Sequence, residues 1–492
     1  MNKNVLKFVL SLKIRRLRQK MGFSLKDLSQ ESGLSHSYLN EIEKGKKYPK
    51  LEKLQKLADA LGVAVDELVS AKMGRQLHPL LSFLESDLAT SLPLSAFGIG
   101  EQDVYDLMSH SPEKFTSFLM TVSELAKSFD VNVDDLNKAA LRAYLEVNNN
   151  HFPYLEELGS TMGRQLRNDI TELNPLQTYQ YFKKKLEGDF GIKVDDEKIG
   201  QKEGSDGLIS LFKRADKGGI LYLNPSLDIR QKIFALVKEL GAQHLISDDS
   251  LKNRDPLKTH FSDLLLEYQT EYFAGALLVP ENELIADLKR FFSLNAFDQE
   301  LFSKVFDKYL APPEFIVERL TQVLPHHFGL NQLFFLRCNE EVLESPARYY
   351  IDQELHLGQL HHPHGVSLRE HYCRRWVTIE LLAGLEESSQ LIGTQVSQMG
   401  EKGSPYFLLS FAHHNTLYQG KRTCYTLGLA INESLNSVVG EDFYEGIEKK
   451  IVGRTCERCT IADCDERVSP PSISIRANKD RLQRDLIRSL LD

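Results

Sequence analysis

The chain has 492 residues, of which 42% are hydrophobic and 26% are charged, and its formal net charge is −9 at neutral pH. This length is too great for one hydrophobic core, so we expect about three domains. The acidic balance excludes a protein that coats nucleic acid with its whole surface. The sequence has no signal-peptide pattern and no apolar run of the roughly 18 residues that a membrane helix needs. We therefore expect a cytoplasmic protein without a membrane partner.

The charge is distributed unevenly along the chain. Residues 1–70 carry 14 Lys and Arg against 8 Asp and Glu, a net charge of +6, and the remainder carries −15. A small basic module on an acidic body is typical of a protein whose one end meets phosphates.

Residues 5–70 are predicted to form five short helices. Ser24 and Ser35 are N-cap residues for the second and third helices, and Gly33 and Gly45 end them. Pro49 is predicted to begin the fourth helix. Apolar residues recur at helical spacing in the first helix, at Leu6, Val9, Leu10, Ile14 and Leu17.

The spacing of these residues resembles the Xre/Cro-type helix-turn-helix repressors. The matching positions are Arg16, Arg18, Gly22, Ser24, Leu28, Gly33, Ser35, Tyr38, Ile42 and Gly45. The resemblance implies an all-α, DNA-binding domain over residues 1–72, whose third helix enters the major groove. The expected DNA-binding residues are Ser24, Ser35, His36, Ser37, Tyr38, Asn40, Lys44, Lys46 and Lys47. Among them, His36, Ser37 and Asn40 are expected at base edges and the lysines at phosphates.

A single short module binds DNA weakly, so we expect a homodimer that binds double-stranded DNA at a palindromic site. A small helical bundle that contacts protein instead of DNA is the alternative for this domain. Residues 73–175 look helical and are assigned to a helical linker region, with a loop at Asn148–Asn150.

From residue 176 to 328 the pattern is mixed, which indicates an α+β domain. A strand is predicted over Gly219–Leu223 and is followed by a helix that includes Ile233, Val237 and Leu240. Two more helices are predicted over 262–278 and 314–328.

The run from Phe234 to Leu245 resembles the active helix of ImmA/IrrE-type metallopeptidases, which carries the zinc motif HExxH. In that motif two imidazoles one turn apart hold zinc and the glutamate acts as a general base. Here Lys238 and Ala242 stand at the two ligand positions, and only Glu239 is retained. The resemblance places the third ligand at Glu267, with Glu271 as the alternative.

The two replaced ligands predict a degenerate domain that is not an enzyme, because an ammonium repels zinc and a methyl group offers no donor atom. His244 lies about 200° further round the helix than the second ligand position and does not replace it. The alternative function is a metallopeptidase coupled to a DNA-binding head, which would cleave a partner regulator.

Residues 329–492 are predicted to form an α+β C-terminal sensor domain that contains a cysteine motif. Strands are expected over 332–337 and 406–411, and a charged helix over 478–491. Cys456 and Cys459 have the spacing of a metal-binding turn, and Cys464 follows. Cys373, Cys424 and His371 remain open as the fourth ligand, and the metal remains open between zinc and an iron–sulfur cluster. A metal-free knuckle or a set of redox thiols is the alternative.

The C-terminal half resembles the short-chain fatty-acyl transcriptional regulators. The resemblance is carried by Pro313–Leu320, Phe328–Leu330, Phe334–Arg337, Cys373–Trp376, Gly453–Cys459, Cys464, Arg467 and Pro470–Pro471. It implies a ligand-responsive regulator whose effector is a short-chain acyl-CoA or a related metabolite.

Overall fold

The computed structural model describes most of the chain, in two compact units. The described residues are 3–69, 94–100, 103, 121–122, 124, 133–170, 174–199, 207–215, 218–245, 260–341, 347–358, 370–386, 390–400, 403–414, 421–440 and 442–491. One unit comprises Met1–Tyr144 and Pro256–Leu264, and the other comprises Leu145–Asp255 and Leu265–Asp492. The chain is therefore multidomain, with a helical N-terminal region and α+β structure later, as predicted. Much of the predicted linker region lies outside the described residues.

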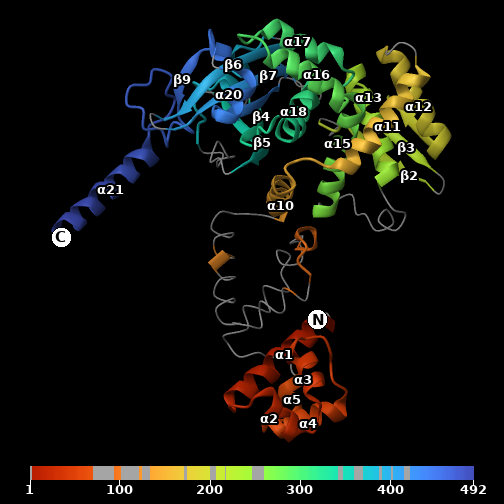
Figure 1. The fold of residues 1–492 in the computed structure, drawn as a ribbon, viewed down its shortest axis with the longest axis vertical. Coiled ribbons are helices and arrows are strands. Elements are labelled where there is room, and N and C mark those ends of the chain that lie inside the picture. The colour runs from red at the N-terminus through yellow and green to blue at the C-terminus, as the bar shows by residue number, and fades with distance from the viewer. Residues whose placement is uncertain are drawn as a thin grey trace. The chain divides into compact units, whose positions relative to one another are not determined.

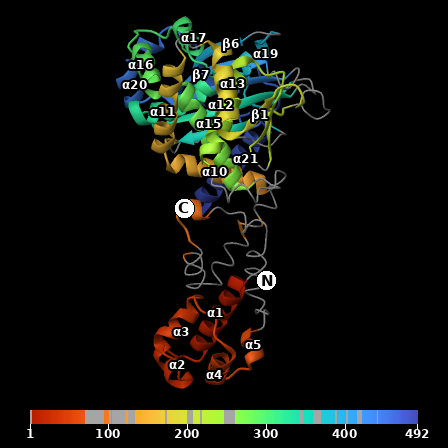
Figure 2. The same cartoon turned by 90° about the vertical axis from the view of Figure 1, so that its right-hand side faces the viewer.

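The N-terminal region consists of short helices around one apolar core (Figures 1 and 2). They are α1 (Lys3–Lys20), α2 (Leu25–Ser32), α3 (His36–Glu43), α4 (Leu51–Leu61) and α5 (Val65–Val69). The core contains Leu10, Ile14, Leu28, Leu34, Leu39, Ile42, Leu54, Leu57, Ala58, Leu61 and Leu68. A short 3₁₀ helix (Leu94–Phe97) follows, and α10 (Val133–Val147) runs across the boundary between the units.

The caps of these helices follow the sequence prediction with one correction. Ser24 and Ser35 cap α2 and α3, and Gly33 ends α2 with φ +64°, a conformation that favours glycine. Pro49 does not begin α4, because Lys50 follows it in an extended conformation and is the N-cap. The side chain of Pro49 is buried.

The second unit begins with a layer of helices beside a small sheet. The helices are α11 (Pro153–Asp169), α12 (Pro175–Phe190), α13 (Ile229–Leu245), α15 (Phe261–Leu278), α16 (Glu281–Phe292), α17 (Gln299–Lys308) and α18 (Pro313–Phe328). The sheet has the order β1 (Ile192–Asp195), β3 (Gly219–Leu223), β2 (Ser210–Arg214). β1 and β3 are parallel, and β2 and β3 are antiparallel.

A six-stranded sheet forms the rest of this unit. Its strands are β4 (Leu333–Glu341), β5 (Arg348–Leu357), β6 (Gln390–Met399), β7 (Pro405–His414), β8 (Arg422–Ala430) and β9 (Lys449–Val452), in the order β5-β4-β8-β7-β6-β9. All neighbours are antiparallel except β6 and β9. Nearly every residue of β8 is buried, which indicates a strand covered on both faces. α18 packs against β4, β7 and β8, and α19 (Val377–Gly384) packs against β6, β7 and β8.

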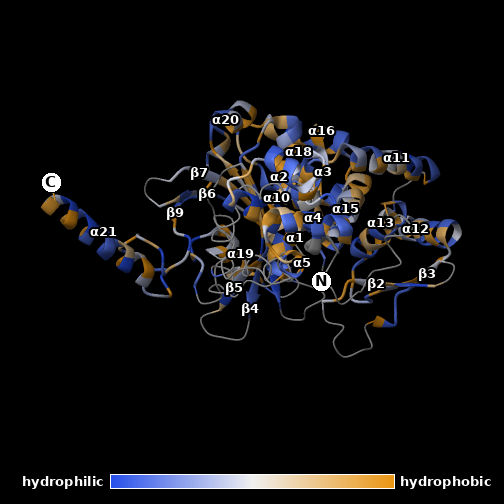
Figure 3. Ribbon diagram, turned by 90° about the horizontal axis from the view of Figure 1, so that it is seen from below, coloured by the Kyte–Doolittle hydropathy of each residue, from blue (hydrophilic) through white to orange (hydrophobic). Residues whose placement is uncertain are grey.

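The chain ends in α20 (Glu433–Val439), a 3₁₀ turn (Asp442–Tyr444) and the long helix α21 (Ser472–Leu491), which projects from the sheet (Figure 1). Apolar and polar residues are mixed along α21 (Figure 3), and none of its described residues is buried. None of the described helices has the length and apolarity needed to cross a membrane.

Several predicted bounds differ from the structure. The terminal helix begins at Ser472 and not at 478, because it starts directly after Pro470 and Pro471, where the N–H groups of Ile473 and Ser474 donate to the carbonyl of Glu457. The predicted linker region extends to residue 175, but α11 within it belongs to the second unit. Leu155 and Leu166 of α11 are buried within this second unit.

A buried ion pair joins three helices of the second unit. Arg319 of α18 is 1% exposed and forms two hydrogen bonds with Glu156 of α11, one from Nη2 to Oε2 at 2.7 Å and one from Nη1 to Oε1. The hydroxyl of Tyr272 on α15 donates to the same carboxylate at 2.6 Å. Nε of Arg319 donates to the carbonyl of Val279 at 3.3 Å. α11, α15 and α18 are therefore held at one charged centre.

Arg319→Met is expected to destabilise the second unit by about 3–5 kcal/mol, because it leaves the carboxylate of Glu156 buried without its cation. The only tryptophan, Trp376, lies in this unit and is 4% exposed, so its fluorescence during urea titration reports the unfolding of this unit. The control is Lys304→Met, which removes the exposed pair of Lys304 with Glu300 and is expected to cost less than about 1 kcal/mol. Equal effects of the two substitutions would contradict the role given to Arg319.

Candidate functional site

The third helix presents a polar stripe to solvent. Leu39 and Ile42 are 0% and 1% exposed and fix the inner face of α3 in the core. His36 and Ser37 are exposed and Asn40 is partly exposed, one turn further along the helix. Short donors and acceptors on one exposed helix face are the groups that can read base edges in a major groove. The structure thus brings the three predicted base-reading residues together on one surface.

The orientation of α3 is fixed by a bidentate ion pair with α1. Nε and Nη2 of Arg18 donate to the two carboxylate oxygens of Glu43 at 2.7 and 2.9 Å. Nη1 of Arg18 also donates to the carbonyl of Phe23 at 2.8 Å, in the turn before α2. Glu43 is 7% exposed, so water screens this pair weakly. One guanidinium therefore locks α1, α3 and the turn between α1 and α2.

Two lysine ammonium groups, of Lys47 and Lys53, lie over the ring of Tyr38. Only Lys47 and Tyr38 were predicted as site residues from the sequence. The ring of Tyr38 packs against the helical core and lies 4.0 Å from Nζ of Lys53 and 5.7 Å from Nζ of Lys47. Lys53 belongs to α4 and was not predicted as a site residue. The signal in the sequence was the helical spacing of Lys53 and Lys56 within α4, three residues apart, after the basic N-cap residue Lys50.

The predicted phosphate-contacting lysines lie at and just after the end of α3. The side chains of Lys44, Lys46 and Lys47 are all exposed. Nζ of Lys47 lies 2.7 Å from the carboxylate of Glu41, and this hydrogen bond raises the pKa of Lys47. The N–H groups of Lys46 and Lys47 donate to the carbonyl of Glu41, so the turn after α3 is ordered.

The two predicted serines act as helix caps in the structure. The hydroxyl of Ser24 accepts from the N–H of Asp27 at 3.2 Å, and the N–H of Ser24 donates to the Asp27 carboxylate at 2.8 Å. The hydroxyl of Ser35 accepts from the N–H of Tyr38 at 3.3 Å. These hydrogen bonds fix the first turns of α2 and α3.

The peptidase-like helix pair holds a lysine ammonium between carboxylates. Nζ of Lys238 on α13 lies 2.8 Å from Glu271 and 3.0 Å from Glu267, both on α15. Burial acts to lower the pKa of Lys238, but the carboxylates of Glu271 and Glu267 outweigh it and raise the pKa above its usual value. The ammonium therefore stays charged and occupies the space in front of both candidate third ligands.

A third carboxyl group lies in the same electrostatic environment. Burial raises the pKa of Glu318 on α18 to about 8, and the negative charge of Glu271 acts in the same direction. Both effects favour the neutral acid form of Glu318.

The remaining positions of the degenerate motif have other contacts. The carboxylate of Glu239 accepts from the amide of Gln243 at 2.6 Å. Ala242 offers only a methyl group. The ring of His244 packs edge-to-face on Phe190 of α12, with ring centroids 5.5 Å apart. A β-carbon on Gly241 would meet Phe273 at 2.5 Å, so glycine allows α13 and α15 to approach closely enough for the lysine contacts.

The C-terminal cysteines lie in a loop that follows β9. Cys456 and Cys459 are buried, and Cys464 is partly exposed. Arg467 holds the loop together, because Nη1 donates to the carbonyl of Cys456 at 3.0 Å and Nη2 donates to the carbonyl of Ile461.

Two of the three candidate fourth ligands approach this loop. The N–H of Gly453 donates to the sulfur of Cys373 at 3.4 Å, and the N–H of Cys456 donates to the carbonyl of His371 at 2.8 Å. Nδ1 of His371 is 2.7 Å from the carboxylate of Glu457. Burial raises the pKa of Cys373 to about 11, and Cys459 and Cys456 add to the shift. Cys424 instead lies on β8, opposite Cys338 of β4.

Among the described residues, no three of these thiols and imidazoles have ligand atoms within 4.8 Å of one another. A β-carbon on Gly453 would lie 2.9 Å from the sulfur of Cys459, so the backbone passes this thiol at a distance that only glycine allows. Sulfur donors suit both zinc and iron–sulfur clusters, and metal binding at this loop stays a prediction.

Comparison with protein families matches two parts of the chain. A helix-turn-helix family model matches residues 14–68, and a model for the IrrE N-terminal-like domain matches residues 188–321. The second match covers the helix pair of Lys238 and Glu267.

The curated relatives match the N-terminal part. The chain is 40% identical over 57 residues to the HTH-type transcriptional regulator DdrOP3 of Deinococcus deserti, which is 12% of this chain and 44% of that protein. The chain thus spans less than half the length of this relative. It is also 40% identical over 55 residues to the uncharacterized HTH-type transcriptional regulator y4dJ of Sinorhizobium fredii, which is 11% of this chain and 71% of that protein.

Solved structures include a Mycobacterium tuberculosis transcriptional regulator, with 18% identity and a TM-score of 0.46 over 67% of this chain and 92% of that one. The restriction-modification controller protein C.AhdI of Aeromonas hydrophila is 36% identical with a TM-score of 0.12, over 14% of this chain and 98% of that one. From the identity and coverage of the y4dJ match, together with the helix-turn-helix model over residues 14–68, the chain belongs to the helix-turn-helix transcriptional regulators.

Proposed function

We propose that this protein is a sequence-specific, DNA-binding transcription regulator that reads its operator with α3. The observation that carries the proposal is the exposed polar stripe of His36, Ser37 and Asn40 on a helix whose inner face and orientation are fixed. The exposed lysines after α3 and Lys53 on α4 supply positive charge for the phosphates on either side.

Two copies of the head on a palindromic operator would supply the affinity that one short helix lacks. We therefore propose a homodimer on DNA. Its operator half-sites would lie about one helical turn, roughly 34 Å, apart or at a multiple of that distance.

Asn40→Ala is expected to weaken binding to the operator by about 1–3 kcal/mol, roughly 5- to 150-fold, because it removes a donor and an acceptor from the base-reading stripe. Binding to unrelated DNA is expected to change little, since phosphate contacts dominate there. The measurement is a fluorescence-anisotropy titration with operator DNA, identified by genome-wide mapping of bound sites, and with a scrambled duplex.

The matched control is Gln55→Ala, which removes an exposed amide from α4 that bonds to Asp59 within the same helix. It is expected to leave both affinities unchanged. Equal loss of operator and scrambled binding in Asn40→Ala would argue against base reading by α3.

The IrrE-like domain is proposed to be non-catalytic. The support is the ammonium of Lys238 between Glu267 and Glu271, together with the methyl group of Ala242 at the second ligand position. A cationic side chain in this place opposes a zinc ion by charge and by volume. The domain then serves as a scaffold or a ligand-binding body for the DNA-reading head.

Glu239→Gln is expected to have no effect on any peptide hydrolysis, because the glutamate has no metal-bound water to activate. The measurement compares cleavage of casein and of proteins encoded near the mapped operators by wild type and variant, with added zinc and with chelator. Chelator-sensitive cleavage that disappears in Glu239→Gln would instead support the alternative, a metallopeptidase coupled to a DNA-binding head.

The C-terminal region is proposed to sense a short-chain acyl-CoA or a related metabolite, a proposal that rests on the sequence resemblance. An apolar cavity of about 20 Å³ between the six-stranded sheet and α19 is lined by Phe334, Leu336, Trp376, Thr378, Ser397, Met399, Tyr406, Leu408, Thr426 and Val452. This volume is close to that of one water molecule, so an acyl chain would enter only if α19 moved. Trp376 and Val452 line the cavity and also lie next to the cysteine loop, since Nε1 of Trp376 donates to the carbonyl of Gly453. A ligand that moved these two residues would therefore also move the loop.

Cys456→Ser is expected to lower the response of operator affinity to propionyl-CoA and to remove metal from the purified protein, since one thiolate of the proposed centre is lost. Elemental analysis and operator titrations with and without propionyl-CoA measure the two effects, and free coenzyme A is the ligand control. Unchanged metal content together with an unchanged response would contradict both roles of the loop.

A further inference from the structure

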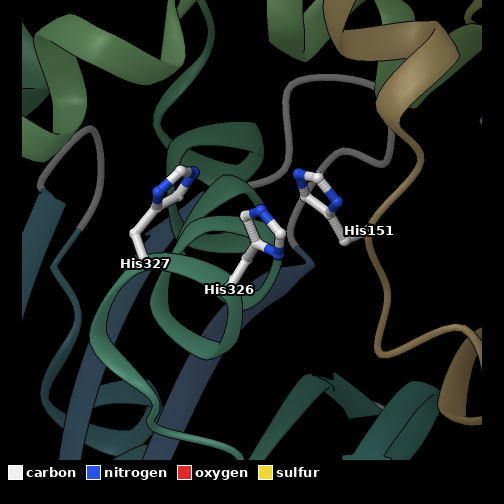
Figure 4. Close-up of side chains that lie close together, drawn as sticks. All are labelled: His151, His326 and His327. Atoms are coloured by element: carbon white, nitrogen blue, oxygen red, sulfur yellow. The ribbon is translucent and has the colours of Figure 1, made fainter.

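Three histidines from distant parts of the sequence lie together in the second unit (Figure 4). The ring of His151 stacks on that of His326, with centroids 3.8 Å apart and planes 9° from parallel. The ring of His327 stands edge-on to His326 at 4.7 Å. One ring nitrogen from each histidine lies within 4.8 Å of the others, which is close enough for all three to reach one ion.

A carboxylate completes this histidine cluster. Oε1 of Glu281, the first residue of α16, lies 2.5 Å from Nε2 of His327 and 3.4 Å from Nε2 of His151. Nε2 of His151 is buried and forms no hydrogen bond of good geometry with the described residues. The cluster therefore contains three imidazoles and one carboxylate, and the buried Nε2 of one of these imidazoles, His151, has no hydrogen bond to a described residue.

The turn before His151 is built to hold it in place. Asn149 and Asn150 both adopt positive φ, at 49° and 50°, which asparagine tolerates better than most residues. Asn150 is 0% exposed, its amide donates to the hydroxyl of Thr321 on α18 at 2.8 Å, and its carbonyl accepts from Tyr268 on α15. This turn fixes His151 against α18, near the end where His326 and His327 lie.

The electrostatics of the cluster favour a bound cation. His326 and His327 lie in the last turn of α18, where the carbonyl groups of the helix give a partial negative charge. Glu281 adds a carboxylate whose ion pairs, within the described part of the chain, are to His151 and His327. The nearby guanidinium of Arg319 is already matched by the carboxylate of Glu156, so it opposes a cation only weakly.

We propose that His151, His326, His327 and Glu281 form a binding site for a divalent transition metal ion of the zinc class. Imidazole nitrogen and carboxylate oxygen are ligands that zinc prefers, at about 2.0–2.2 Å in tetrahedral geometry. Such ligand atoms lie roughly 3.4 Å apart, so rotation of the exposed His326 and His327 side chains closes the set. The ion replaces the proton between His327 and Glu281, and that proton passes to solvent.

This site differs from the two regions already described. It contains no thiol, unlike the cysteine loop, and none of its residues belongs to the degenerate motif on α13. A bound ion would join the start of α11, the start of α16 and the end of α18, and would stabilise the native state in proportion to its occupancy.

Cobalt(II) is the probe that separates this site from the cysteine loop, because only thiolate ligands give an intense charge-transfer band in the near ultraviolet. Titration of the full chain is expected to give one equivalent of cobalt with visible d–d bands typical of nitrogen and oxygen ligands. The variant with His151→Ala, His326→Ala and His327→Ala is expected to lose this equivalent and to keep any thiolate band. Zinc is expected to raise the melting temperature that Trp376 fluorescence reports by more in the wild type than in the triple variant, which keeps only the cysteine loop as a candidate zinc site.

Two single substitutions test the same site if the triple variant does not fold. Glu281→Gln preserves a hydrogen-bonding group beside His327 and is expected to weaken cobalt binding at least about tenfold. His414→Ala, in the pair of adjacent histidines at the end of β7, is the control and is expected to bind cobalt as the wild type does. The proposal is overturned if the wild type shows no such bands, or if Glu281→Gln binds cobalt with wild-type affinity.

Discussion

The second unit depends on matching one buried charge. The guanidinium of Arg319 can leave water only because Glu156 accepts two of its hydrogen bonds and Tyr272 orients that carboxylate. The three helices that meet there also hold the other clusters of polar and charged side chains in this unit. α11 begins beside His151, α15 carries Glu271 next to Tyr272, and α18 ends at the two adjacent histidines. The ion pair thus sets the positions of both polar clusters of this unit.

The need to match a buried charge with an opposite charge also explains how the IrrE-like helices α13 and α15 pack together without histidines at the two zinc-ligand positions. Carboxylates that face a cleft require a cation, and a metal ion is one solution. Lys238 is another, because its ammonium is supplied by the chain itself and forms hydrogen bonds with Glu267 and Glu271. An ammonium supplied by the chain thus balances the charge of these carboxylates without a bound metal ion.

The sequence predicted the N-terminal helices well, because capping serines, terminating glycines and periodic leucines are local signals. The strand Gly219–Leu223 and α13, α15 and α18 were also predicted from their patterns. β8 was not singled out, because a strand buried on both faces lacks the alternation that marks a half-exposed strand. β1, β2, β5, β6 and β9 were also not predicted, and β1 and β9 are only four residues long. The ion pair of Arg18 with Glu43, the role of Lys53 and the assembly of His151 with His326 depend on contacts between residues far apart in sequence. No local pattern predicts such contacts.

The register of β4 and β8 places Cys338 directly opposite Cys424, with both side chains at most 1% exposed. Burial raises the pKa of Cys424 to about 12, and it also raises that of Cys338, so neither side chain is a thiolate at neutral pH. An alkylating reagent attacks the thiolate, and it would reach these two sulfurs only when the central strands separate. Their rate of alkylation in native buffer is therefore a built-in measure of how often the sheet opens, and their rate in denaturant, where both sulfurs are accessible, gives the reference.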